Sequence, residues 1–196
     1  MSNSDHPMIG SVFQKQVLEW FQKEYGIEFE LEKKIPIGYP AKDHKFDIVD
    51  TAGKIAIECK RYTWTETGNV PSAKMGFTNE AAFYLSFLPD RYEKYIVMLK
   101  SRHPKRNESL AEYYFKTNHH LLGKIKVAEY DPERNELRVV GQNDFTKKKE
   151  YEQAKVIYEE LLKEYPSYRR QIEMEWKEEP TLENMEELKG IAEAFF

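Results

Sequence analysis

The stretch FDIVDTAGKIAIECK, residues 46–60, decides the fold predicted for this chain. Strand-like runs at 46–49 and 55–62 flank a short segment that contains Gly53. Two strand-like runs joined by so short a segment are typical of a β-hairpin. We therefore expect two antiparallel strands here, and the rest of the fold is built outward from them.

Side chains on the second predicted strand fall into two sets, because successive residues of a strand point to opposite faces. One set should face the core: Ile55, Ile57 and Cys59. The other set carries the charged groups: Ala56, Glu58 and Lys60. On the first strand the same rule pairs Phe46 with Ile48 on one face. It leaves Asp47 and Val49 on the opposite face.

The register of the hairpin places Asp47 opposite Glu58. A turn centred between Ala52 and Gly53 sets these carboxylates across from each other, with Cβ atoms about 4.5–5.5 Å apart. Carboxylates at that separation repel each other unless they share a proton or a cation. A hard divalent ion relieves the repulsion, and carboxylate oxygens favour Mg²⁺ or Mn²⁺ over zinc. Lys60, on the same face, adds a positive group that can help to activate water and to neutralise charge on a phosphodiester.

These residues resemble the PD-(D/E)XK superfamily of restriction-endonuclease-like nucleases. The resemblance lies in Asp47, followed across a short hairpin by Glu58-Cys59-Lys60, and the order of elements over residues 9–140 is similar too. It implies that Asp47 and Glu58 bind the metal and that the backbone carbonyl of Cys59 adds a ligand. It also implies that Lys60 positions or activates the attacking water.

The first predicted helix departs from the family pattern. Many members carry a glutamate there, near a Gly-x-x-Phe-Glu pattern, whereas here residues 10–13, Gly-Ser-Val-Phe, are followed by Gln14. A neutral amide can orient water or coordinate a metal, but it supplies no charge. Glu19, further along the same helix, is the alternative supplier, and a second metal is left open.

Elements on either side of the hairpin predict a mixed sheet flanked by helices. Apolar spacing and stop signals indicate helices at 9–25, 73–88 and 109–122. Alternation or short apolar runs indicate strands at 27–37, 94–100, 125–130 and 137–140. This order predicts an α/β (α+β) fold with a mixed central sheet, and the resemblance adds a restriction-endonuclease-like core.

The pattern changes in the last quarter of the chain. Helical stripes at 151–165 and 182–195, the second with Thr181 as its N-cap, predict a C-terminal helical appendage. We expect a nuclease core at residues 1–145 and an acidic helical extension at residues 146–196.

Charge is divided along the chain, whose net charge is -4. Residues 54–106 hold ten basic and five acidic residues, a net +5, whereas residues 128–196 hold eleven basic and eighteen acidic residues, a net -7. Because nucleic-acid binding draws on cations that face phosphates, the basic region is expected to contact DNA. The candidate contacts are Lys42, Lys45, Arg61, Lys74, Arg102, Lys105 and Arg106. Tyr62 and Trp64 could stack on bases, with a core or lid role as the alternative.

Composition excludes several other kinds of site. Cys59 is the only cysteine, which rules out an internal disulfide and a cysteine-held zinc or iron–sulfur centre. No segment holds about 18 uninterrupted apolar residues. The opening residues 1–7 lack a basic stretch followed by an apolar run. We expect a soluble, cytoplasmic protein with no membrane contact.

The sequence therefore predicts a Mg²⁺- or Mn²⁺-dependent endonuclease that hydrolyses DNA phosphodiester bonds. The alternative is a catalytically weak or inactive nuclease-like domain that serves as a DNA-binding or protein-assembly module, which Gln14 favours. A hydrolase of nucleotides or other phosphoesters is a third reading. A homodimer and a protein partner for the acidic C-terminal helices are left open, as are DNA against RNA and single against double strands.

Overall fold

The hairpin expected at residues 46–60 is present in the computed structural model, which describes residues 5–178 and 181–195. Its strands are β2 (Lys42–Asp50) and β3 (Ile55–Lys60). Ile48 pairs with Ile57 and Val49 with Ala56, which is the register predicted from the turn.

Asp50 holds the turn of this hairpin. Its Oδ1 accepts the backbone N–H groups of Lys54 and Ile55, at 2.6 and 2.7 Å. Gly53 has a φ of +66°, which glycine adopts without the strain that a side chain brings. A Cβ at Gly53 would also lie 3.0 Å from the hydroxyl of Tyr92. The turn therefore fixes the register, and through it the relative positions of the two strands that carry the charged residues.

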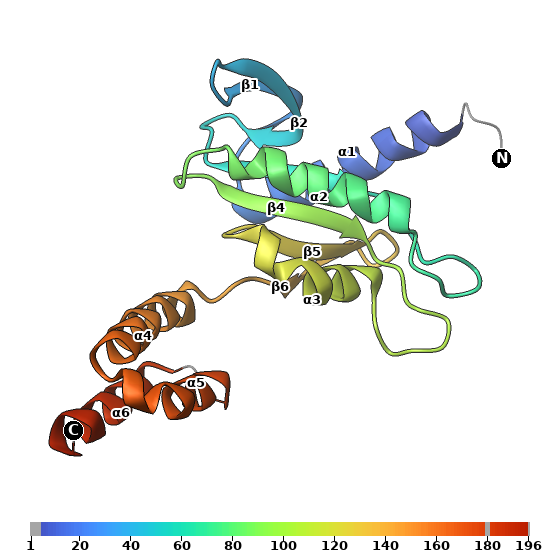
Figure 1. The fold of residues 1–196 in the computed structure, drawn as a ribbon. Coiled ribbons are helices and arrows are strands. Elements are labelled where there is room, and N and C mark those ends of the chain that lie inside the picture. The colour runs from blue at the N-terminus through green and yellow to red at the C-terminus, as the bar shows by residue number, and fades with distance from the viewer. Residues whose placement is uncertain (1–4, 179–180, 196) are drawn as a thin grey trace. The chain divides into compact units, whose positions relative to one another are not determined.

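Six strands form one mixed sheet in the order of the sequence, β1 to β6 (Figure 1). The strands β1 (Phe29–Ile37), β2 and β3 are antiparallel neighbours. Both β4 (Glu93–Leu99) and β5 (Lys126–Asp131) run parallel to β3, and β6 (Glu136–Gly141) is antiparallel to β5. The predicted α/β class with a mixed sheet is confirmed.

Helices cover both faces of this sheet (Figure 1). On one face α1 (Asp5–Tyr25) packs its side chains Phe13, Val17 and Phe21 on the sheet. On the other face lie α2 (Ser72–Ser86) and α3 (Leu110–Leu122), which form the crossovers between the parallel strands. Ser109 caps α3 through a reciprocal pair of hydrogen bonds with Glu112.

One predicted face assignment is wrong. Phe46 packs with Val49 on the α2 and α3 face, whereas Ile48 packs against α1. The pairing of β1 with β2 skips Glu32 and Asp47, and Glu32 has a φ of +54°. A left-handed residue interrupts the regular alternation of a strand pair. The interruption therefore places Phe46 on the α2 and α3 face of the sheet, opposite to Ile48. It also removes Asp47 from the regular alternation of side chains along β2.

The chain divides into two units, of which the first ends at Asn143 and the second begins at Asp144. The second unit is helical, with α4 (Phe145–Glu164), a 3₁₀ turn (Pro166–Tyr168), α5 (Arg169–Glu178) and α6 (Leu182–Phe195).

A small core holds the second unit together, with Leu161, Ile172 and Ala192 buried in it. Oγ1 of Thr181 accepts the backbone N–H of Asn184 at 3.2 Å, which confirms the predicted N-cap. No described helix of either unit has the length and apolar character needed to cross a membrane.

Candidate active site

Asp47, Glu58 and Lys60 lie together where β2 and β3 separate. The Nζ of Lys60 donates to Oε2 of Glu58 at 2.9 Å. Oδ2 of Asp47 accepts the backbone N–H of Cys59 at 2.8 Å, although the hairpin register would pair Cys59 with Phe46. The carboxylate of Asp47 thus replaces a backbone acceptor. The structure brings the three predicted residues into one cluster, named here the carboxylate cluster.

Burial and mutual repulsion act on both acids of the carboxylate cluster. Glu58 is 5% exposed, and burial followed by the charge of Asp47 raises its pKa from 4.5 to about 7. Burial also raises the pKa of Asp47, against the opposing hydrogen bond from Cys59. Burial disfavours the ammonium of Lys60, but the neighbouring carboxylates outweigh it and raise the pKa of Lys60. The single lysine therefore leaves part of the negative charge uncompensated, which a bound cation would relieve.

Gln14 of α1 is the first-helix residue that reaches the carboxylate cluster. Its Nε2 donates to Oδ1 of Asp47 at 2.8 Å. Glu19 lies instead near Tyr130 of β5, where burial and then the charge of Glu19 raise the pKa of the Tyr130 hydroxyl. Of the two first-helix candidates, Gln14 is thus the one in position to orient Asp47, and it adds no charge.

A cleft of about 310 Å³ opens beside the carboxylate cluster, on the side of α2. Its walls include Tyr62, and Phe77, Glu80 and Tyr84 of α2. His44 also lines it and stacks on Tyr84, with 3.8 Å between the ring centroids. Sequence reasoning missed the α2 residues and His44. The spacing of positions 77, 80 and 84 marks one face of a helix, but it does not show which strands that face borders.

Two of the predicted DNA contacts adjoin this cleft. Lys45 lines it and pairs with Glu32 at 3.0 Å. The Nζ of Lys74 lies over the rings of Tyr62 and Phe77, 5.6 and 5.7 Å from their centroids.

Two further candidates lie at the outer ends of the two hairpin strands. Arg61 is exposed directly after β3, and Lys42 is exposed at the start of β2. Nothing in their surroundings assigns either side chain a ligand.

The basic loop after β4 is different, because most of its cations have carboxylate partners. Arg102 pairs with Glu112 at 3.5 Å and Arg106 with Glu108 at 3.9 Å. Lys105 is exposed. The pairing lowers the charge that this loop can offer to phosphates.

Trp64 belongs to the core rather than to a binding surface. Its side chain is buried and lies against the rings of His103 and Tyr113, at 4.8 and 5.3 Å between centroids. The proposal that Trp64 stacks on bases is therefore wrong, and the core alternative holds. Tyr62, by contrast, is half-buried and lines the cleft.

The donor atoms of the carboxylate cluster suit a hard divalent cation. Asp47 and Glu58 supply carboxylate oxygens, and the carbonyl of Cys59 points to the same side of the strand as its N–H, which meets Asp47. Across residues 5–178 and 181–195, no three His, Cys, Asp or Glu side chains gather to hold a metal. A bound ion would therefore complete its coordination with the carbonyl, water and phosphate, as Mg²⁺ commonly does.

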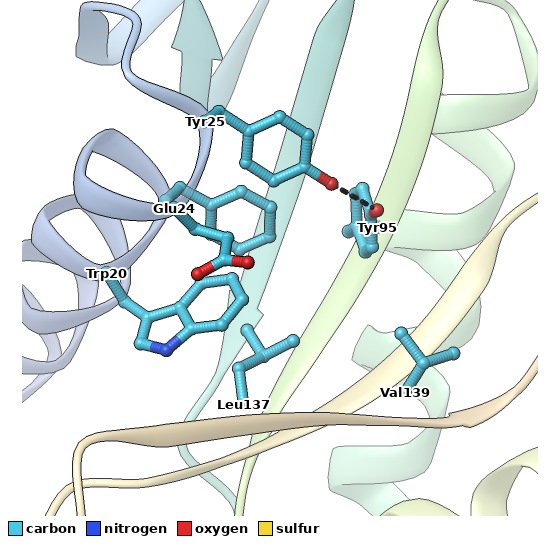
Figure 2. A pocket seen from close by; sticks show the side chains of 7 residues that line it. Trp20, Glu24, Tyr25, Tyr95, Leu137 and Val139 are labelled. Carbon is cyan, nitrogen blue, oxygen red and sulfur yellow. Dashed lines mark hydrogen bonds between the residues drawn. The ribbon is translucent and has the colours of Figure 1, made fainter.

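A second hollow, of about 270 Å³, lies on the α1 side of the sheet (Figure 2). Its lining is largely aromatic and apolar: Trp20, Phe21, Glu24, Tyr25, Tyr95, Leu137 and Val139. The hydroxyl of Tyr25 donates to that of Tyr95 at 2.9 Å, because Tyr95 in turn donates to Glu93 at 2.6 Å. Lys126 forms an ion pair with Glu93. These polar groups satisfy one another, so we place the candidate chemistry at the carboxylate cluster.

Comparison with known proteins gives no match to a protein-family model, to a curated protein or to a solved structure.

Proposed function

We propose that this chain is a metal-dependent nuclease with a restriction-endonuclease-like core, which hydrolyses phosphodiester bonds in DNA. One observation carries the proposal: Asp47 and Glu58 are largely buried and close enough to repel each other, and the lysine of the cluster, Lys60, pairs with Glu58. Such an arrangement costs stability unless a ligand completes it, and clusters of this kind are typical of functional sites.

The order of elements supports the same proposal. A helix, three antiparallel strands, a second helix and a strand parallel to the third follow one another from α1 to β4. Asp47 lies on β2 and Glu58 to Lys60 lie on β3, as the resemblance to the PD-(D/E)XK superfamily implies.

Each residue of the cluster has a role in this hydrolysis. Asp47 and Glu58 hold the ion, and Gln14 keeps one oxygen of Asp47 oriented. When bound, Mg²⁺ or Mn²⁺ supplies a Lewis acid that activates water and offsets charge on the phosphate. Lys60, tethered by Glu58, directs its ammonium to the water or to a phosphate oxygen.

The test is hydrolysis of purified DNA by the full chain with Mg²⁺, with Mn²⁺ and with EDTA. We expect cleavage with either ion, none with EDTA, and none in Asp47→Asn. Cleavage that persists in EDTA, or an Asp47→Asn variant as active as the wild type, contradicts the proposed mechanism.

The presence of Gln14 at the cluster favours a second function, a nuclease-like DNA-binding or assembly module without activity. A neutral amide there lowers the charge available to a cation. Calorimetry separates the two functions. Heat of Mn²⁺ binding that is lost in Asp47→Asn supports the enzyme, whereas DNA affinity without any metal binding supports the module. A protein partner for the acidic helical unit remains a prediction.

A further inference from the structure

The cleft beside the carboxylate cluster has aromatic walls that hydrolysis itself does not require. Phe77 projects from α2 with 51% of its surface exposed, and Tyr62 lines the cleft from the chain that follows β3. Exposing a large apolar ring to water costs free energy that burial against the protein would recover. A role in contacting a ligand would account for a half-exposed phenylalanine beside Glu58 and Lys60.

Lys74 places a cation beside these rings, where it can contact an anionic ligand. The Nζ of Lys74 lies over both Tyr62 and Phe77, and Lys74 forms no ion pair with a carboxylate within the described residues. Lys45 and Lys60 line the same cleft, although each already contacts a carboxylate. Glu80 is a further acid in the wall and accepts a long, 3.4 Å hydrogen bond from the hydroxyl of Tyr84. A ligand that combines flat rings with phosphates matches both the aromatic and the cationic groups.

Flat rings joined by phosphates occur in nucleic acids, but a duplex hides the faces of its bases inside the stack. An aromatic side chain at the mouth of a cleft can stack only on a base whose face is free. The cleft volume of about 310 Å³ also limits the number of nucleotides that the cleft can hold.

We propose that this cleft binds single-stranded nucleic acid, with bases stacked on Phe77 and Tyr62 and the adjoining phosphate held by Lys74. The stacked rings of His44 and Tyr84 extend the aromatic wall of the cleft and so lengthen the surface available to the nucleic-acid strand. This inference rests on the proposed function in one respect: a strand bound in the cleft would bring the phosphate to be cleaved next to Lys60. Binding of the strand itself, however, needs neither the metal nor hydrolysis.

The test measures binding of the full chain in EDTA, so that cleavage plays no part. Fluorescence anisotropy follows a labelled oligothymidine and a hairpin duplex of the same length. We expect the single strand to bind more tightly than the duplex. Phe77→Ala should weaken single-strand binding about 5- to 150-fold, the range for loss of one stacked base.

Phe83→Ala is the matched control for this substitution. Phe83 lies on the same helix and is 59% exposed, but it does not line the cleft. Its replacement should leave single-strand affinity unchanged. Phe77→Trp, which keeps an aromatic face, should restore binding, and thermal unfolding of all three variants checks that they fold.

Three results would overturn the inference. One is a duplex bound as tightly as the single strand, and another is equal loss of affinity in Phe77→Ala and Phe83→Ala. The third is that the wild type forms a dimer, that Phe77→Ala dissociates this dimer, and that oligothymidine does not bind. The ring of Phe77 would then contact a second copy of the chain and not a base. If instead single-strand binding depends on Phe77 but DNA is not cleaved with Mg²⁺ or Mn²⁺, the inference stands and the proposed catalysis fails.

Discussion

Two clusters of the first unit place basic side chains beside carboxylates, and they differ in how fully the positive charges compensate the negative ones. In the carboxylate cluster, Lys60 contacts Glu58 at 2.9 Å, and Asp47 takes its hydrogen bonds from Gln14 and the backbone. In a second group, named here the arginine cluster, Arg138 bridges two carboxylates. Its Nη2 lies 2.8 Å from Glu129 and 2.6 Å from Glu112, and Arg102 also reaches Glu112, at 3.5 Å.

The titration of the acids follows this geometry. Burial acts to raise the pKa of Glu112, but hydrogen bonds from Arg138 and from the Ser109 backbone outweigh it and lower the pKa. The pKa of Glu58 moves in the opposite direction, to about 7. A planar guanidinium can serve two carboxylates at once, whereas an ammonium acts as a point charge. The arginine cluster therefore contributes to the fold, while the carboxylate cluster keeps repulsion that a ligand can relieve.

The largest expected effect is on activity, in Lys60→Ala. Loss of a positioned cation beside the reacting phosphate should lower metal-dependent DNA hydrolysis at least about 100-fold, the scale found when one transition-state donor is removed. Cleavage of purified DNA with Mn²⁺ measures it. Arg138→Ala is the matched control and should retain activity per folded molecule. Undiminished cleavage in Lys60→Ala would contradict the role assigned to this lysine.

The second effect is on stability, in Glu58→Gln, and it depends on pH. Because the folded-state pKa of Glu58 is raised from 4.5 to about 7, the folded state binds the proton more tightly than the unfolded chain does. The contribution of Glu58 to stability is therefore fully present below pH 4.5 and is lost as the pH rises through about 7. At pH 8 without metal, Glu58→Gln should raise the free energy of unfolding by up to about 3 kcal/mol. At pH 4 the same substitution should change the free energy of unfolding little.

Urea unfolding in EDTA at both pH values checks the change in Glu58→Gln. The matched variant Glu129→Gln should instead lose stability at pH 8, because it weakens the charge-assisted hydrogen bonds with Arg138. Equal changes in the two variants would remove the distinction between the clusters.

A third substitution, Arg138→Ala, tests the arginine cluster directly. Glu129 is 3% exposed, and without Arg138 its carboxylate loses the partner that offsets its burial. The free energy of unfolding should fall by about 1–3 kcal/mol, measured by urea titration. Lys33→Ala, which breaks an exposed pair with Glu30, is the control and should change stability little.

The smallest expected effect concerns the first helix. Gln14→Glu places a third carboxylate beside Asp47 and should tighten Mn²⁺ binding about tenfold, because affinity for hard cations rises with the charge of the ligands. Calorimetry measures the affinity. Glu19→Gln should leave it unchanged, since Glu19 lies near Tyr130. If Glu19→Gln weakens Mn²⁺ binding instead, the assignment of Gln14 to the cluster is wrong.

Local signals in the sequence were enough to predict the hairpin. Gly53 and the alternation of residues 55–60 give the register, and the register brings Asp47 near Glu58. The face of Phe46 could not be predicted, because it depends on the left-handed backbone of Glu32 in a neighbouring strand. Glutamate is not a residue that signals such a conformation.

Other features depend on packing between distant elements. The contact of Gln14 with Asp47 spans thirty-three positions, and the arginine cluster joins α3 to β5 and β6. Helix α5 was missed because its ten residues, Arg169–Glu178, are mostly polar, with Ile172 as the buried residue. The chemistry of the site was thus predictable from a local motif, whereas its walls, with Phe77 among them, required the assembled fold.

The strand order of the sheet has a consequence for the way the protein is made. Each strand, from β1 to β6, neighbours the strand synthesised immediately before it. The entropic cost of loop closure is smaller for contacts between successive strands than for distant ones, which favours rapid folding, and the chain is synthesised from its N-terminus. The hairpin with Asp47 and Glu58 can therefore pair before β5 and β6 exist. Co-translational folding would begin with the strands that bear the repelling carboxylates, and the later strands would add the ion pairs that stabilise the sheet.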